Sequence, residues 1–159
     1  MVLLEFAVVA GTTDLTTGSA PIFNNLITVV DASRLTSGDI YASVLTTMVV
    51  KLARRKADSG TPYSGDANGT ISADEFTAAL TVAQSQVKST LGFGLDSSTD
   101  IFTTSPLITS ATTTPAQQAQ VAAYRQAIEA VAAISNAVSE SGGGATAQEA
   151  FKGFLKFLF

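Results

Sequence analysis

Residues Ile40–Arg55 read IYASVLTTMVVKLARR, and this stretch decides the fold class. Its apolar residues recur with a period of about 3.6, which is the repeat of one face of an α-helix. The members of that face are Ile40, Val44, Leu45, Met48 and Leu52. Basic residues in the last turn, up to Arg55, oppose the negative end of the helix dipole. The segment therefore predicts an amphipathic helix that packs against a core.

Three further helices are indicated by signals at their N-termini. Ser72 comes before a second helical pattern and Glu75 follows three residues later, which is the spacing of a capping box. Thr114–Gln117 repeats this signal, with proline at the first helical position. After the glycine-rich stretch Ser141–Gly144, residues Thr146–Glu149 predict the start of a last, short helix.

The N-terminal region follows a period of two instead. Val2, Leu4 and Phe6 alternate with residues of the opposite face, and Leu26–Val30 is a second run rich in β-branched residues. Two such strands form a hairpin, which is only marginally stable in water unless it packs on something else. The fold class is thus predicted as mainly α, a helical bundle of about four helices with an N-terminal β-hairpin appendage. Residues 1–33 form the hairpin segment and residues 34–159 the helical domain.

One loop of the helical domain carries recognisable chemistry. Residues 64–75 read SGDANGTISADE and resemble the calcium loop of the EF-hand family. In that family, oxygen donors alternate along the loop so that a tight turn wraps a hard cation. The resemblance implies that Gly69 makes the sharp turn. The implied metal ligands are Ser64, Asp66, Asn68, the Thr70 carbonyl, Ser72 directly or through water, and both oxygens of Glu75.

The loop departs from the EF-hand pattern in two ways. Its first ligand is Ser64 instead of aspartate, which removes a negative charge, and residues 60–62 (Gly-Thr-Pro) interrupt the helix that should lead into it. A metal-free alternative also stays open. Residues 66–69 (Asp-Ala-Asn-Gly) make a favourable turn without any ion, and Ser72 with Glu75 is explained by helix capping alone.

With two carboxylates, Asp66 and Glu75, the loop predicts a weak calcium site. Affinity falls with the charge of the ligands, so we expect a Kd of about 10⁻⁴ to 10⁻³ M, as in extracellular modules. Such a site would be nearly empty in bacterial cytosol and filled in calcium-rich surroundings. We therefore expect the protein to be secreted or on the cell surface, although the first residues, MVLLEFAVVAG, contain no visible signal peptide.

The composition argues against several classes of function. His, Cys and Trp are absent, which removes imidazole bases, thiol nucleophiles and nearly every zinc or copper site. The net charge is −4 and basic residues cluster only at Arg54–Lys56, so nucleic acid is not an expected partner. No apolar run reaches the roughly 18 residues of a membrane span. Because no base stands beside the Ser and Thr hydroxyls, we expect no enzyme.

Four further segments carry a second resemblance: Val2–Phe6, Thr13–Gly18, Val44–Val49 and Leu91–Asp96. Together they resemble a helical domain of large exported bacterial lipoproteins and surface proteins of the adhesin type. The resemblance implies a surface location, other domains or subunits of a surface protein as partners, and no catalytic residues.

The sequence therefore predicts a non-catalytic, calcium-binding structural or adhesive module of an exported bacterial surface protein. The alternative is a self-assembling extracellular filament or layer subunit, a homo-oligomer that makes contacts through its strand Val2–Val9 or its tail Phe151–Phe159. Phe151, Phe154, Leu155 and Leu158 share one helical face in that tail. Such a face fits the core of the same chain, another subunit or a membrane surface.

Overall fold

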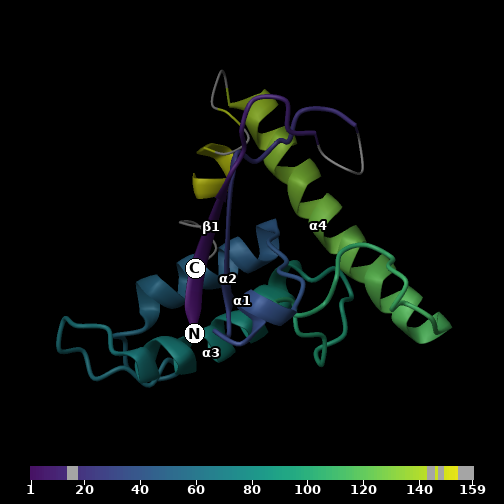
Figure 1. The fold of residues 1–159 in the computed structure, drawn as a ribbon. Helices are drawn as coiled ribbons and strands as arrows, with labels where there is room; N and C mark the ends of the chain where they lie inside the picture. The colour runs from purple at the N-terminus through teal and green to yellow at the C-terminus, as the bar shows by residue number, and fades with distance from the viewer. Residues whose placement is uncertain (14–17, 143–145, 147–148, 154–159) are drawn as a thin grey trace.

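The computed structural model describes residues 1–13, 18–142, 146 and 149–153, and it places two strands ahead of a set of helices (Figure 1). The elements are β1 (Val2–Ala7), β2 (Asn25–Val30), α1 (Arg34–Ser37), α2 (Val44–Lys56), α3 (Ala73–Leu91) and α4 (Pro115–Ser141). Residues 149–153 are also helical. The prediction of a mainly helical fold with an N-terminal β-hairpin is confirmed. The predicted number of about four helices is not confirmed as such, because α1 is a single turn and 149–153 adds a fifth helical segment.

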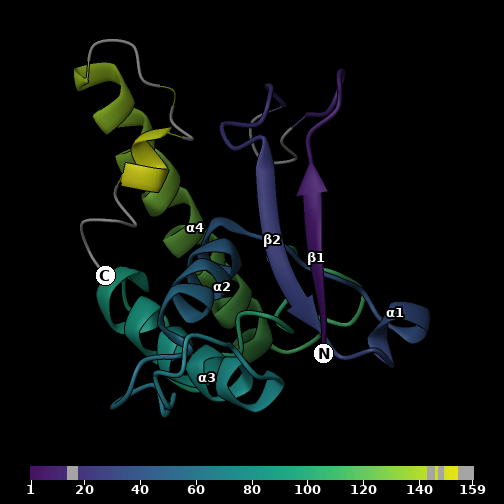
Figure 2. The same ribbon diagram turned by 90° about the vertical axis from the view of Figure 1, so that its left-hand side faces the viewer.

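The hairpin is antiparallel, with a register that runs from Val2 opposite Val30 to Ala7 opposite Asn25. β2 lies between β1 and α2 (Figure 2), and its last four residues are buried. β1 is mostly exposed, with Val2 and Leu4 half-buried. The two-stranded sheet is therefore stabilised by the helices behind β2, as a hairpin of this size requires.

Helix α2 begins later than the apolar periodicity suggests. Ser43 caps it: the Ser43 hydroxyl accepts the N–H of Thr46 at 3.2 Å, and the Thr46 hydroxyl accepts the N–H of Ser43 at 2.8 Å. This reciprocal cap fixes the first turn, so that Ile40 precedes the helix and is not part of its face. Nine of the 13 residues of α2 are buried, which makes it the most enclosed helix of the part described.

Two threonines at the start of α2 bind the backbone of β2. The Thr46 hydroxyl donates to the carbonyl of Ile27 at 2.9 Å, and the N–H of Ile27 donates to the Thr47 hydroxyl at 2.9 Å. All three residues are buried. Side chains of a helix thus satisfy strand groups that would otherwise be buried without partners.

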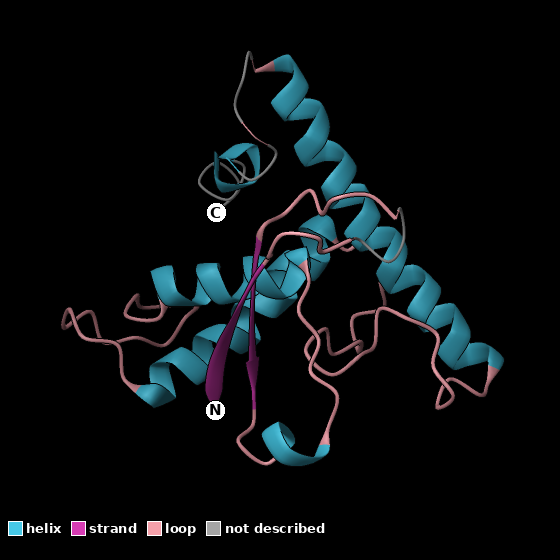
Figure 3. Ribbon diagram, turned by 45° about the horizontal axis from the view of Figure 1, so that its top comes forward, coloured by secondary structure: helices cyan, strands magenta, loops and turns pink. Residues whose placement is uncertain are grey.

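The other two long helices, α3 and α4, each pack against α2 through one stripe of buried residues. The buried residues of α3 are Ala79, Leu80, Ala83, Val87 and Leu91, and those of α4 are Val121, Tyr124, Ala127, Val131 and Ser135. Both begin at the predicted capping boxes, Ser72 with Glu75 and Thr114 with Gln117. Ala127 of α4 is fully buried, whereas Val138, near the end of this helix, is 44% exposed. In Figure 3, the upper end of α4 extends well past the hairpin.

The start of the predicted apolar tail belongs to the core. Phe151 is 1% exposed and its ring meets that of Phe23 edge-on, with centroids 5.1 Å apart. Thr146 and Glu149 form the reciprocal hydrogen bonds of the predicted cap. Residues 154–159, and with them the rest of the predicted stripe, lie outside the described residues. Within the described ranges, no helix combines the length and apolarity needed to cross a lipid bilayer.

A buried hydroxyl network ties α4 to the start of α2. The Tyr124 hydroxyl donates to the carbonyl of Ile101 at 2.9 Å and lies 2.9 Å from the hydroxyl of Ser43. Because Tyr124 has one hydroxyl proton, Ser43 is the donor of the second bond. Burial raises the pKa of Tyr124, so the phenol stays protonated and keeps its role as donor.

We expect Tyr124→Phe to lower the free energy of unfolding by about 1–3 kcal/mol, because it leaves the hydroxyl proton of Ser43 without an acceptor and the carbonyl of Ile101 without a donor. Urea unfolding followed by circular dichroism measures this change. Tyr41→Phe is the matched control, since its hydroxyl donates to the exposed Asp39 carboxylate at 3.2 Å, and a change within about 0.5 kcal/mol is expected. Equal effects of the two substitutions would show that the network adds no stability.

Candidate metal centre

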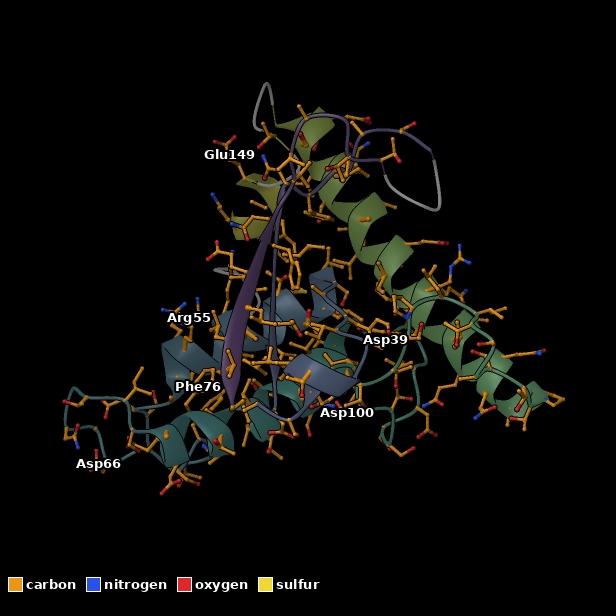
Figure 4. All side chains as sticks on the ribbon, viewed as in Figure 1. Asp39, Arg55, Asp66, Phe76, Asp100 and Glu149 are labelled. Atoms are coloured by element: carbon orange, nitrogen blue, oxygen red, sulfur yellow. The ribbon has the colours of Figure 1, made fainter. Side chains whose placement is uncertain are left out.

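The loop between α2 and α3 projects from one end of the molecule, and Figure 4 shows Asp66 on it, beyond the ends of both helices. Asp58 comes two residues after the last residue of α2. Glu75 lies in the first turn of α3. The two helix ends therefore hold Asp58 and Glu75, and the loop between them carries Asp66.

Three carboxylates converge across this loop. Asp58, Asp66 and Glu75 each offer an oxygen, and these oxygens all lie within 4.8 Å of one another. Two of the three, Asp66 and Glu75, are ligands predicted from the sequence. The third, Asp58, lies outside the predicted segment 64–75. A cluster of this kind could hold a metal ion.

Asp58 is bound tightly to the turn that contains Gly69. One carboxylate oxygen accepts the N–H of Asn68 at 3.0 Å, and the other accepts the N–H of Gly69 at 2.9 Å. Its carbonyl accepts the N–H of Ala67 at 2.9 Å. Gly69 has φ +85°, which glycine adopts without strain, as the sequence predicts for this position. Asp58 thus fixes the turn directly after α2 ends.

Asp66 and Asn68 form a second layer of contacts. Asp66 accepts the backbone N–H of Asn68 at 3.2 Å and its side-chain amide at 2.8 Å. The amide oxygen of Asn68 accepts the N–H of Thr70 at 2.7 Å. Carboxylate and amide oxygens have more than one lone pair, so these bonds orient the groups and leave acceptor capacity for a cation.

Glu75 connects the loop to the first turn of α3. Its carboxylate accepts the N–H of Ser72 at 2.8 Å, the N–H of Asp66 at 3.0 Å and the hydroxyl of Ser72 at 2.8 Å. The backbone bond from Ser72, followed by that from Asp66 and the hydroxyl bond, holds the pKa of Glu75 below its ordinary value. Glu75 is therefore ionised at neutral pH, as a metal ligand must be.

The remaining predicted ligands are near this cluster, but their role stays a prediction. Ser64 is exposed and has φ +65°, an uncommon conformation for serine. Thr70 and Ser72 contribute their N–H groups to the contacts described above. Ser72 also caps α3, which is the alternative use that the sequence suggested for it.

Residues 59–65 separate Asp58 from Asp66, and close packing at residues 63–65 brings the chain back to the carboxylate cluster. Tyr63 is 6% exposed and its hydroxyl donates to Gln86 of α3. A Cβ on Gly65 would lie 2.2 Å from the carbonyl oxygen of Ala57, so only glycine fits there. The loop therefore folds back onto the end of α2, and this return brings Asp66 to Asp58.

The signal that could have identified Asp58 is its place after a helix. The sequence pattern assumes that the first ligand stands two residues before Asp66, whereas Asp58 reaches the same turn from eight residues before it. A search for a carboxylate just after the entering helix, at any spacing from the glycine turn, would have found it.

The chain was compared with models of known protein families, with curated proteins and with solved structures. No family model, no curated protein and no solved structure matches it.

Proposed function

We propose that this chain is a non-catalytic, calcium-binding structural or adhesive module of an exported bacterial surface protein. The observation that carries the proposal is the convergence of the Asp58, Asp66 and Glu75 carboxylates within 4.8 Å. Among the described residues, the ion pair found is that of Arg125 with Glu129 in α4. No Lys or Arg of these residues therefore forms an ion pair with the carboxylate cluster. Three negative charges in one small volume repel one another, and a bound cation would remove that repulsion.

The donor set favours calcium over other metals. All candidate ligands are oxygens, which suit hard cations and not zinc or copper. Calcium accepts six to eight oxygens in irregular geometry, whereas magnesium requires a near-ideal octahedron. A loop with side chains of different reach, such as Asp58, Asn68 and Glu75, meets the calcium requirement more readily.

The third carboxylate changes the expected affinity. With two carboxylates the expected Kd is about 10⁻⁴ to 10⁻³ M. The additional negative charge of Asp58 lowers the expected Kd to about 10⁻⁴ M. This affinity still fits a calcium-rich exterior better than the cytosol. The ion would join the end of α2 to the start of α3, so its role is to make that junction rigid.

Calcium should raise the melting temperature. At a free concentration of about 100 times the Kd, binding adds about 2.7 kcal/mol to the free energy of unfolding, which is a shift of roughly 5–10 °C for a chain of this size. Asp66→Asn should weaken calcium binding by about tenfold, or about 1.4 kcal/mol. Circular dichroism melting measures the temperature shift, and isothermal titration calorimetry with calcium, and with magnesium for comparison, measures the change in affinity.

The matched control is Asp74→Asn, which removes the same charge from an exposed position next to Glu75. It should bind calcium like the unchanged chain. Asp58→Asn should weaken binding more than Ser64→Ala does, because it removes a charged oxygen. A melting curve that calcium leaves unchanged would eliminate the metal site and support the metal-free turn.

The metal-free protein should lose stability in acid partly through Glu75. Because the pKa of Glu75 is lowered on folding, its contribution is complete above its ordinary pKa of 4.5 and is lost as the pH falls through the lower folded value. Melting temperatures between pH 6 and pH 2.5 should therefore fall less steeply for Glu75→Gln than for the unchanged chain. Glu129→Gln, at an exposed position of α4, serves as control and should keep the original slope.

A second function, the self-assembling subunit, is favoured by one observation. β1 is bonded to β2 on one side, and it exposes Leu3 (39%) and Phe6 (45%). An exposed edge with apolar side chains is a template for an added strand.

If this second function holds, the mass measured by light scattering should rise with concentration above 16.3 kDa. Leu3→Lys should restore the monomer, because a charge on an edge strand opposes strand addition. Leu35→Lys, at an equally exposed site in α1, should not. A constant mass of 16.3 kDa would exclude the subunit and leave the calcium module.

A further inference from the structure

A groove separates the β-hairpin from α4. We call it the hairpin–α4 groove. It is a cavity of about 420 Å³ between the end of β1, the segment before β2, the start of α2, residues 106–107 and the middle of α4. Pockets for small molecules have volumes of about 300–1,000 Å³. The groove is therefore large enough for a ligand of small-molecule size.

The walls of the groove gather exposed apolar side chains from distant parts of the sequence. Phe6, Ile22 and Leu107 line it and are each more than a third exposed, at 45%, 44% and 37%. Ile128 and Ala132 of α4 complete the opposite wall. Apolar side chains that converge in one concave site, instead of being scattered singly over the surface, are typical of a binding site.

The polar group best placed to select a ligand is Arg125, which lines the groove from α4. Its guanidinium lies 3.5 Å from the carboxylate of Glu129, which is one turn further along and also lines the groove, and both side chains are exposed to solvent. Such a pair contributes little to stability. A guanidinium binds a carboxylate through two parallel hydrogen bonds, so a carboxylate ligand could take the place of Glu129 at small cost.

Size decides between a small molecule and a protein as the occupant. A stable protein partner covers about 800 Å² on each side, much more than the floor of a 420 Å³ cavity. We propose that the hairpin–α4 groove binds a small carboxylate with an apolar body, of the kind represented by a medium-chain fatty acid. The apolar body contacts Phe6, Ile22 and Leu107, and the carboxylate binds Arg125. This binding is independent of calcium.

The test is a titration of the full chain with decanoate, kept below the concentration at which it forms micelles. Decyltrimethylammonium, which has the same chain length and the opposite charge, is the comparison ligand. One decanoate should bind per chain, at least about tenfold more tightly than the cation. In amide NMR spectra of the same samples, the signals around Ile22 and Leu107 should shift while those of residues 58–75 stay in place.

Two substitutions separate charge from shape. Arg125→Gln should weaken decanoate binding about tenfold without weakening binding of the cation, because Glu129 then faces the groove without its partner. Ala132→Phe should fill the groove and abolish binding of both, whereas Ala133→Phe, on the exposed side of the same helix, should not. Circular dichroism melting shows whether Ala132→Phe still folds. The NMR shifts of the unchanged chain locate the bound ligand without this variant. Absence of saturation, equal affinity for the two ligands, or shifts located elsewhere would overturn the proposal.

Discussion

The arrangement of the molecule depends on two hydrogen bonds at Ile27, whose carbonyl accepts from the Thr46 hydroxyl and whose N–H donates to the Thr47 hydroxyl. They join a strand edge to a helix inside the core, where unpaired N–H and C=O groups would be strongly destabilising. β2 is thereby held against α2, and β1 is held only through β2. These bonds add a fixed register to the apolar packing of Phe23, Ile27 and Val29 against the helices.

Both ends of α2 carry a polar arrangement, while its middle is apolar and buried. At the start, Ser43 connects the helix to Tyr124 of α4. At the end, the chain passes directly into Asp58 and the carboxylate cluster. A helix enclosed in this way moves little, so the position of Asp58 is determined by the core. The position of Asp66, in contrast, depends on the contacts within the loop itself.

Local signals predicted the elements well. Capping boxes at Ser72 and Thr114 mark helix starts because the bonds they make involve residues only three apart. The carboxylate cluster was predicted only in part, because the sequence did not indicate Asp58. Asp58 lies near Asp66 because residues 59–65 fold back on α2, which depends on the burial of Tyr63 and the close approach of Gly65 to Ala57. Such contacts between segments have no fixed spacing in the sequence. The start of α2 was misplaced for a related reason, since a continuous apolar periodicity does not show where Ser43 interrupts it.

The closed inner edge of β2 also limits the symmetry of any assembly built through strands. Since Ile27–Val30 are buried, the sheet formed by the described residues has one open edge, that of β1. Two such edges can pair with each other about a two-fold axis, and neither edge is then free to pair with a third chain. Strand pairing alone would therefore end at a dimer with a four-stranded sheet. A fibre or a layer would need a second, different contact elsewhere on the surface.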